Sequence, residues 1–168
     1  MARVDYTTIE TILNELEAQY SRTLGLANVT LPVAYSKLAL LEMSGWIEES
    51  VDTILYNYID NKILDVDCKN RVRDIIEHNY SFDYKHLYHI FICTLGVNNW
   101  ENIIDAISPA RISVLTTKCN DYKRKRNDAA HTYQLVTTTY PAPSQVISDF
   151  HVIRPILFDV EQEIIKLI

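Results

Sequence analysis

The sequence predicts an all-α helical bundle, and three observations support this prediction. The 168-residue chain contains only three glycines and five prolines, too few for the many tight turns that an all-β fold requires. Apolar residues recur three and four positions apart along most of the chain, which is the period of an amphipathic helix. Two such stretches are long, one at about residues 30–62 and one from about residue 144 to the end. We therefore expect one helical domain over residues 1–168, with a long second helix and a long C-terminal helix.

The first helix is expected to begin near Asp5 or Thr7. Thr7 and Glu10 have the spacing of a capping box, in which each side chain bonds the backbone N–H of the other residue. Apolar residues then recur with helical spacing as far as Leu24, and Gly25 is expected to end the helix.

The second helix is expected to open at residues 30–32, because Pro32 suits a first helical turn, and to run to about Lys62. From Val33 to Met43 it is apolar on nearly all sides, which indicates burial between neighbouring helices. Glu42 interrupts this run on the side opposite the main apolar stripe. A carboxylate in such a place either faces water or pairs with a buried cation, and both interpretations stay open.

Three shorter helices are expected after a polar connection at residues 65–68. Asp83 resembles an N-cap and Gly96 a helix stop, and these two residues set the limits of the middle helix. The three helices cover about residues 69–77, 83–94 and 98–106.

The histidines and cysteines do not form a recognisable metal site. His86 and His89 lie three positions apart, as metal ligands can, but no third ligand at a useful spacing accompanies them. We interpret both as flanks of an apolar core face, and we predict no metal and no cofactor. The scattered cysteines favour free thiols in a reducing compartment, and therefore a cytoplasmic protein; they are Cys68, Cys93 and Cys119.

The last part of the chain predicts two further helices with a loop between them. The first starts at Ser108-Pro109 and continues through a basic run to about Tyr133. Residues 134–143 are β-branched and proline-rich, so they are expected to form an extended loop, after which Ser144 caps the final helix. The apolar positions of that helix form a seam typical of bundles: Val146, Phe150, Ile153, Leu157, Val160, Ile164 and Leu167.

Charge is distributed unevenly along the chain. The formal net charge of −6 excludes the basic signature that whole nucleic-acid-binding proteins often carry. Residues 118–126 nevertheless hold five cations against one acid, which gives a local positive region. The alternative is a solvated helix end, since cations favour helix C-termini. No apolar run is long enough for a membrane span and no signal-peptide core follows Met1, so no membrane partner is expected.

Reactive side chains are most concentrated in residues 123–133, which hold Lys123, Arg124, Lys125, Arg126, Asn127, His131 and Tyr133. A permanent cation, an imidazole that titrates near neutrality and a positive field suit phosphodiester chemistry without a metal. In a helix Asn127 and His131 share a face, whereas Arg126 points about 140° away from His131. A two-fold pair of such helices would bring both groups into one cleft, so the spacing favours a homodimer.

This segment resembles a known signature. Residues 126–131 read Arg-Asn-x-x-Ala-His and resemble the R-x4-H signature of HEPN domains. Thr132 and Tyr133 make the segment similar to the R-x4-H-x-Y form of HEPN toxins that pair with small nucleotidyltransferase antitoxins. A long apolar second helix with the embedded acid Glu42 agrees, and the short middle helices are similar to the RiboL-PSP-HEPN branch. The resemblance covers most of the chain in pattern and residues 126–133 in identity.

The resemblance implies a metal-independent endoribonuclease that cuts RNA in a cleft between two protomers. It implies that His131 is the acid–base group and that Arg126 binds the scissile phosphate. Asn127 would orient either His131 or the phosphate. Lys123, Arg124 and Lys125 would bind the RNA backbone. By the same resemblance, Glu42 corresponds to an acid beside the arginine, and Tyr133 to a position that an antitoxin modifies with AMP.

Three functions are therefore consistent with the sequence. The first is a ribonuclease of host defence or of a toxin–antitoxin pair, with an antitoxin or defence protein as partner. The second is a non-catalytic HEPN module that binds RNA, a nucleotide or a partner protein. The third is a structural or dimerisation domain in which the motif arose by chance. The intact set of Arg126, Asn127 and His131 favours the first.

Overall fold

Helices make up nearly all of the computed structural model, which describes residues 3–27, 29–79, 81–131 and 139–168. These ranges contain seven α-helices and no strand, so the predicted all-α class is confirmed, as are the long second and last helices. The helices are α1 Thr7–Thr23, α2 Thr30–Lys62, α3 Val66–Glu77, α4 Tyr84–Leu95, α5 Val97–Ile107, α6 Pro109–His131 and α7 Pro143–Ile165.

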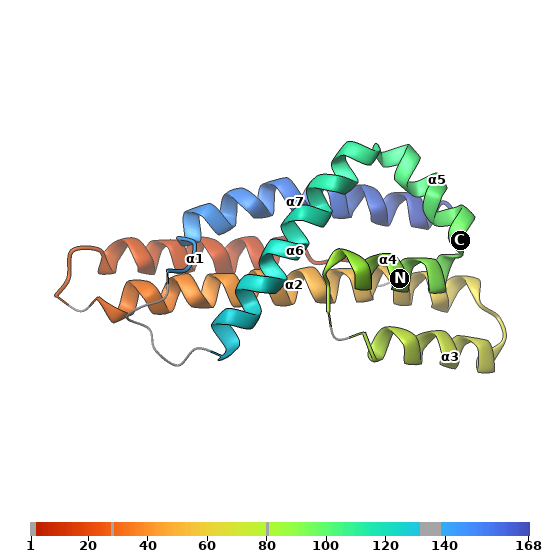
Figure 1. The fold of residues 1–168 in the computed structure, drawn as a ribbon, viewed down its shortest axis with the longest axis horizontal. Helices are drawn as coiled ribbons and strands as arrows, with labels where there is room; N and C mark the ends of the chain where they lie inside the picture. Colours follow the sequence, from red (N-terminus) through yellow and green to blue (C-terminus); the bar gives the residue numbers. More distant parts are fainter. Residues whose placement is uncertain (1–2, 28, 80, 132–138) are drawn as a thin grey trace.

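Helix α2 lies at the centre of the bundle. It packs against α1, α3, α4, α6 and α7, and in Figure 1 it runs alongside α1 while α6 crosses it obliquely. These neighbours bury α2 from Ala39 onward, whereas the start of the apolar run is less covered than predicted, since only Ser36 is buried between Val33 and Leu38. Its fully or almost fully buried apolar residues include Ala39, Leu40, Met43, Ile47, Val51, Ile54, Leu55 and Ile59.

The start of α1 differs from the predicted capping box. Asp5, rather than Thr7, supplies the capping oxygen: its Oδ1 accepts from the backbone N–H of Thr7 at 2.9 Å and of Thr8 at 3.0 Å. A further bond from the Thr8 hydroxyl, together with these backbone bonds, holds the pKa of Asp5 well below its ordinary value. The cap position is Tyr6 and Thr7 is the first helical residue, so the Thr7 side chain stands one residue too late for the predicted role.

The final helix also starts differently from the prediction. Ser144 was expected to cap α7, but the helix begins at Pro143 and Ala142 occupies the cap position without a side-chain bond. A proline lacks the N–H that a cap would satisfy, so the helix can open on it directly. The seam prediction is confirmed, because six of its seven apolar positions, from Val146 to Ile164, are buried.

The middle helices lie close to their predicted limits. Helix α3 begins at Val66, earlier than expected, because Asp65 accepts a bond from the Cys68 backbone N–H at 2.8 Å and caps it. Asp83 caps α4 as predicted, and Gly96 ends it with a φ of 86°, a conformation that glycine adopts without strain. Helix α4 packs against both α3 and α6, and all three of these helices contact α2 (Figure 1).

Two buried carboxylates of α7 link distant parts of the chain. Asp149, 5% exposed, accepts from Lys118 Nζ at 2.6 Å and from the Tyr122 hydroxyl at 3.1 Å, and so joins α7 to α6. Glu161, 3% exposed, accepts from the Val4 backbone N–H at 3.3 Å and holds the N-terminal segment against α7. Because buried charges are costly without partners, these bonds fix where α6 and the N-terminal segment lie.

Truncation of Leu40 to alanine should destabilise the fold by about 2–5 kcal/mol, because its side chain is fully buried in α2. The matched control is Leu38→Ala two residues earlier, where the leucine is 42% exposed and the loss should stay within about 0.5 kcal/mol. Urea unfolding followed by circular dichroism measures both. Equal losses in the two variants would contradict the central position of α2.

Candidate functional site

Helix α6 carries the residues that the sequence singled out. Its buried face points into the bundle and consists of Ile112, Leu115, Cys119, Tyr122 and Ala129. Arg126 and Asn127 lie beside this face and are half-buried, whereas His131, the last residue of the helix, is exposed. The helix therefore holds the arginine against the bundle and presents the histidine to solvent.

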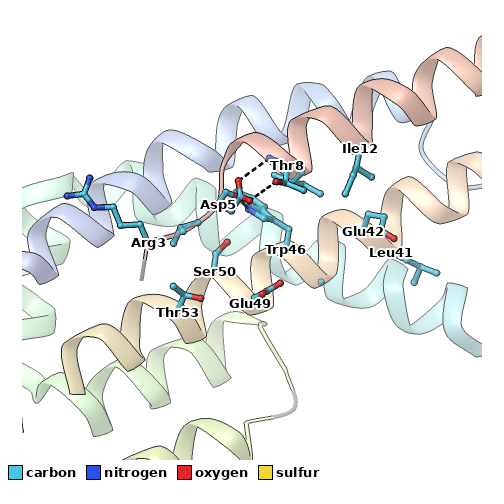
Figure 2. Close-up of a pocket in the computed structure, with 13 residues that line it drawn as sticks. Arg3, Asp5, Thr8, Ile12, Leu41, Glu42, Trp46, Glu49, Ser50 and Thr53 are labelled. Atoms are coloured by element: carbon cyan, nitrogen blue, oxygen red, sulfur yellow. Dashed lines mark hydrogen bonds between the residues drawn. The ribbon is translucent and has the colours of Figure 1, made fainter. Parts of the chain in front are cut away.

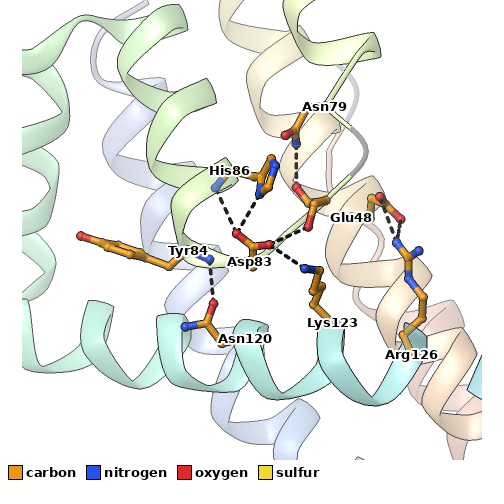
Figure 3. A network of polar contacts seen from close by, with 9 residues as sticks. Glu48, Asn79, Asp83, Tyr84, His86, Asn120, Lys123 and Arg126 are labelled. Atoms are coloured by element: carbon orange, nitrogen blue, oxygen red, sulfur yellow. Dashed lines mark hydrogen bonds and ion pairs between the residues drawn. The ribbon is translucent and has the colours of Figure 1, made fainter. Parts of the chain in front are cut away.

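The guanidinium of Arg126 is held on two sides. Its Nη2 lies 3.2 Å and 3.4 Å from the two carboxylate oxygens of Glu48 on α2 (Figure 3). Its Cζ lies 5.6 Å from the ring centroid of Phe82, a side chain that is only 1% exposed. A carboxylate and an aromatic face together restrict the guanidinium to one orientation, which a ligand would find preformed.

A pocket of about 300 Å³ opens beside this arginine. Six described residues line it: His78, Ser81, His86, Lys123, Arg126 and Asn127. Every one of them carries a side-chain N–H or O–H group, and the carboxylates of Asp83 and Glu48 bond to these donors without lining the pocket themselves. Lys123 and Arg126 each have further N–H groups beside the one that pairs with a carboxylate, and Asn127 adds an amide, so the cavity suits an anion.

Asp83 connects the donors of this pocket. Its Oδ1 accepts from His86 Nδ1 at 2.8 Å, and its Oδ2 accepts from the Ser81 hydroxyl at 2.9 Å and lies 3.2 Å from Lys123 Nζ (Figure 3). Burial alone would raise the pKa of Asp83, but the bonds from His86, Ser81 and Lys123 outweigh it and hold the pKa well below its ordinary value. Asp83 is therefore a carboxylate at neutral pH and fixes the positions of the imidazole and the ammonium group.

The basic run contributes less to this pocket than its sequence suggests. Arg124 and Lys125 both pair with Asp121 one turn earlier on α6, at 2.9 Å and 2.5 Å. Of the three predicted RNA-binding cations, the structure brings only Lys123 into the pocket. Because each cation of residues 123–126 already has a carboxylate partner, the local positive field is weaker than the count of charges implies.

His131 lies apart from the arginine within one chain. It is exposed at the end of α6 and is not among the described residues that line the Arg126 pocket. This agrees with the divergent directions that the helical spacing gives to Arg126 and His131. Tyr133 and residues 134–138 of the predicted loop at residues 134–143 lie outside the described residues.

The acid beside Arg126 is Glu48, and the expectation for Glu42 is therefore corrected. Six residues along a helix correspond to about 120° around its axis, so the two glutamates point to different neighbours. Glu48 reaches α6, whereas Glu42 lines a separate pocket of about 510 Å³ between α1 and α2, near Asp5 and Trp46 (Figure 2).

Three residues of the Arg126 pocket were missed by sequence reasoning: His78, Ser81 and His86. His86 was interpreted as a flank of the core, yet it follows the N-cap Asp83 by three residues. At that spacing the side chain of the later residue lies over the cap carboxylate. The spacing of Asp83 and His86 is therefore the sequence feature that could have predicted their contact. His89 lies one turn away from this pair, with its Nε2 3.7 Å from the Cys93 sulfur.

No family model matches the chain, and no curated protein or solved structure matches it either. Among the described residues, no helix has the length and apolar character needed to cross a bilayer. The described residues also contain no group of three or more His, Cys, Asp or Glu side chains that could hold a metal ion.

Asp52 lies one turn beyond Glu48 on α2 and is half-buried. Burial, followed by the charges of Glu48 and Glu49, raises its pKa from 3.8 to about 6. A carboxyl whose pKa is raised by folding costs more free energy to ionise in the folded state than in the unfolded state. Its contribution to stability is thus present below pH 4 and is lost as pH rises through about 6.

Replacement of Asp52 by asparagine should stabilise the protein at pH 8 and leave it unchanged near pH 4. A shift of this size corresponds at most to about 3 kcal/mol, and solvent screening of a half-exposed group reduces the expected gain to about 1 kcal/mol. Urea unfolding at pH 4, 6 and 8 measures the difference between variant and wild type. A gain of the same size at all three pH values would contradict the assigned ionisation.

Proposed function

We propose that the protein is a metal-independent cytoplasmic endoribonuclease that acts as a homodimer in host defence or in a toxin–antitoxin pair. The observation that supports this most is the fixed guanidinium of Arg126, which stands at the edge of a pocket lined by N–H and O–H donors. An anion of the size of a phosphodiester meets preformed partners there, without a cost for ordering a long side chain.

The proposed reaction needs three groups. His131 takes the proton of a ribose 2′-hydroxyl as that oxygen attacks the neighbouring phosphorus, and the bond from phosphorus to the 5′-oxygen breaks. A proton returns to the leaving oxygen, and the products are a 2′,3′-cyclic phosphate and a 5′-hydroxyl. Arg126 stabilises the added charge on the phosphate and Asn127 orients it. The need for a 2′-hydroxyl restricts the substrate to RNA.

Two protomers are part of the proposal. Within one chain the exposed His131 lies outside the pocket that contains Arg126, so the imidazole of a second copy would have to complete the cleft. The HEPN resemblance supports such an assembly as an expectation. It also supports an antitoxin or defence partner, with Tyr133 as a predicted site of modification.

A non-catalytic binding module is the second candidate. The bond between Arg126 and Glu48 and the separation of His131 from the pocket favour it, because the pocket of a single chain can hold an anion without an acid–base group from the motif. Cleavage of RNA decides between the two candidates.

His131→Ala should lower RNA cleavage by about 10²–10⁴-fold, the typical contribution of a positioned acid–base group. His151→Ala is the matched control, since His151 is also an exposed helical histidine but lies on α7. Cleavage of a labelled single-stranded RNA is followed in EDTA, with unfolding curves for each variant. Intact RNA with wild-type protein, or equal activity of the His131 variant, would reject the ribonuclease.

Mixing two inactive variants tests the shared cleft. Arg126→Ala and His131→Ala homodimers should each be inactive, whereas heterodimers formed by refolding them together should regain part of the wild-type rate. The heterodimer pairs an intact arginine from one protomer with an intact histidine from the other. Lack of recovery despite heterodimers seen by native mass spectrometry, or a monomer at micromolar concentration, would reject the composite site.

A further inference from the structure

Two pockets meet at His86, at the start of α4. The first is the pocket of about 300 Å³ beside Arg126, and the second measures about 560 Å³ and is lined by Lys85, His86, Tyr88, His89 and Ile92. His86 belongs to both linings, so the pockets adjoin. Both volumes lie within the range typical of small-molecule sites.

The two pockets differ in chemistry. The first presents the cations Lys123 and Arg126 and the amide of Asn127, whereas the Ser81 hydroxyl that also lines it donates to Asp83. The second presents the ring of Tyr88 with Ile92 one turn further along the same helix. A ligand that occupies both would carry an anionic group at one end and a flat apolar group at the other.

His86 is oriented for a role between the two pockets. Asp83 accepts from its Nδ1 at 2.8 Å and from its backbone N–H at 3.3 Å, so the ring is tied to the cap of its own helix (Figure 3). The carboxylate fixes the tautomer with the proton on Nδ1 and leaves Nε2 as the ring nitrogen that Asp83 does not use. In the imidazolium form Nε2 donates, which suits a phosphate oxygen.

Tyr88 is likewise held in place. Its ring centroid lies 5.5 Å from that of Tyr84, and the Tyr84 backbone N–H donates to Asn120 Oδ1 of α6 at 2.9 Å. The half-buried Tyr88 therefore stands on a rigid helix start that is tied to the same helix as Lys123 and Arg126. An ordered aromatic side chain beside a cationic pocket is the arrangement on which a nucleobase stacks.

We propose that the two pockets form one nucleotide subsite, complete within a single protomer and built largely from residues outside the Arg126–His131 segment. The phosphate group binds between His86, Lys123 and Arg126, and the base stacks on Tyr88. The inference rests on the proposed function for the identity of the polymer, RNA, but binding at this subsite requires neither cleavage nor a second protomer.

Three probes separate the parts of the subsite: inorganic phosphate, adenosine and adenosine 3′-monophosphate. Isothermal titration at pH 6.5 and 50 mM salt gives each Kd, and the imidazole signals in ¹H–¹⁵N spectra locate the binding. We expect the nucleotide to bind about tenfold more tightly than phosphate or adenosine alone, because a tenfold gain lies within the range that stacking of one base contributes. Nucleotide binding no tighter than that of phosphate would overturn the proposal.

Two variants of His86 separate its ligand contact from its structural contact. His86→Asn keeps an N–H donor near the Nδ1 position for Asp83 and removes Nε2, so the fold should persist while nucleotide affinity falls about tenfold. His86→Gln places an amide near the Nε2 position and should bind more tightly than His86→Asn. Wild-type affinity in His86→Asn would overturn the proposal. His151→Gln is the control and should bind like the wild type.

Tyr88→Leu gives a second test that does not depend on the cap of α4. It should lose most of the advantage of the nucleotide over phosphate and keep the phosphate affinity, since leucine retains the packing and lacks the aromatic face. An unchanged advantage would overturn the stacking assignment. His131→Ala should bind the nucleotide normally, because His131 is not among the residues that line the two pockets. Wild-type protein that binds the nucleotide but leaves RNA uncut would reject the ribonuclease alone.

Discussion

Burial of the broad apolar face of α2 is the constraint on which the other helices depend. This face cannot remain in water, and the chain covers it with α1, α3, α4, α6 and α7 in turn. The helices that cover it meet at fixed places, and one of those places is where the α3–α4 connection and the start of α4 face α6. The Arg126 pocket lies there, so its geometry follows from the way that α2 is covered.

The polar groups around Arg126 follow from the same burial. Glu48 projects from α2 toward α6, and Asp83 stands at the cap of α4, so each carboxylate occupies a place that the helix packing already determines. The two carboxylates fix the guanidinium of Arg126, the ammonium group of Lys123 and the imidazole of His86. These three groups line the pocket, and the carboxylates that orient them do not. The cost is a weaker local field than four consecutive cations would otherwise produce.

The fold was predicted well because its main signals are local. Apolar spacing gave all seven helices and the seam of α7, and Asp83 and Gly96 marked the limits of α4. The errors lie at helix starts, where Asp5 replaced Thr7 as the cap of α1 and Ala142 replaced Ser144 at α7. Several polar residues near a helix start can serve as caps, and the sequence does not rank them.

The sequence by itself determined the helical class, the long central helix and the placement of Arg126, Asn127 and His131 along one helix, because these follow from periodicity and spacing. Only the tertiary structure decided that Glu48 rather than Glu42 holds Arg126 and that His86 joins the pocket. It also decided that Lys123 reaches the pocket whereas Arg124 and Lys125 do not. Those residues are separated by dozens of positions in the chain. Their meeting depends on how whole helices pack, which no local pattern encodes.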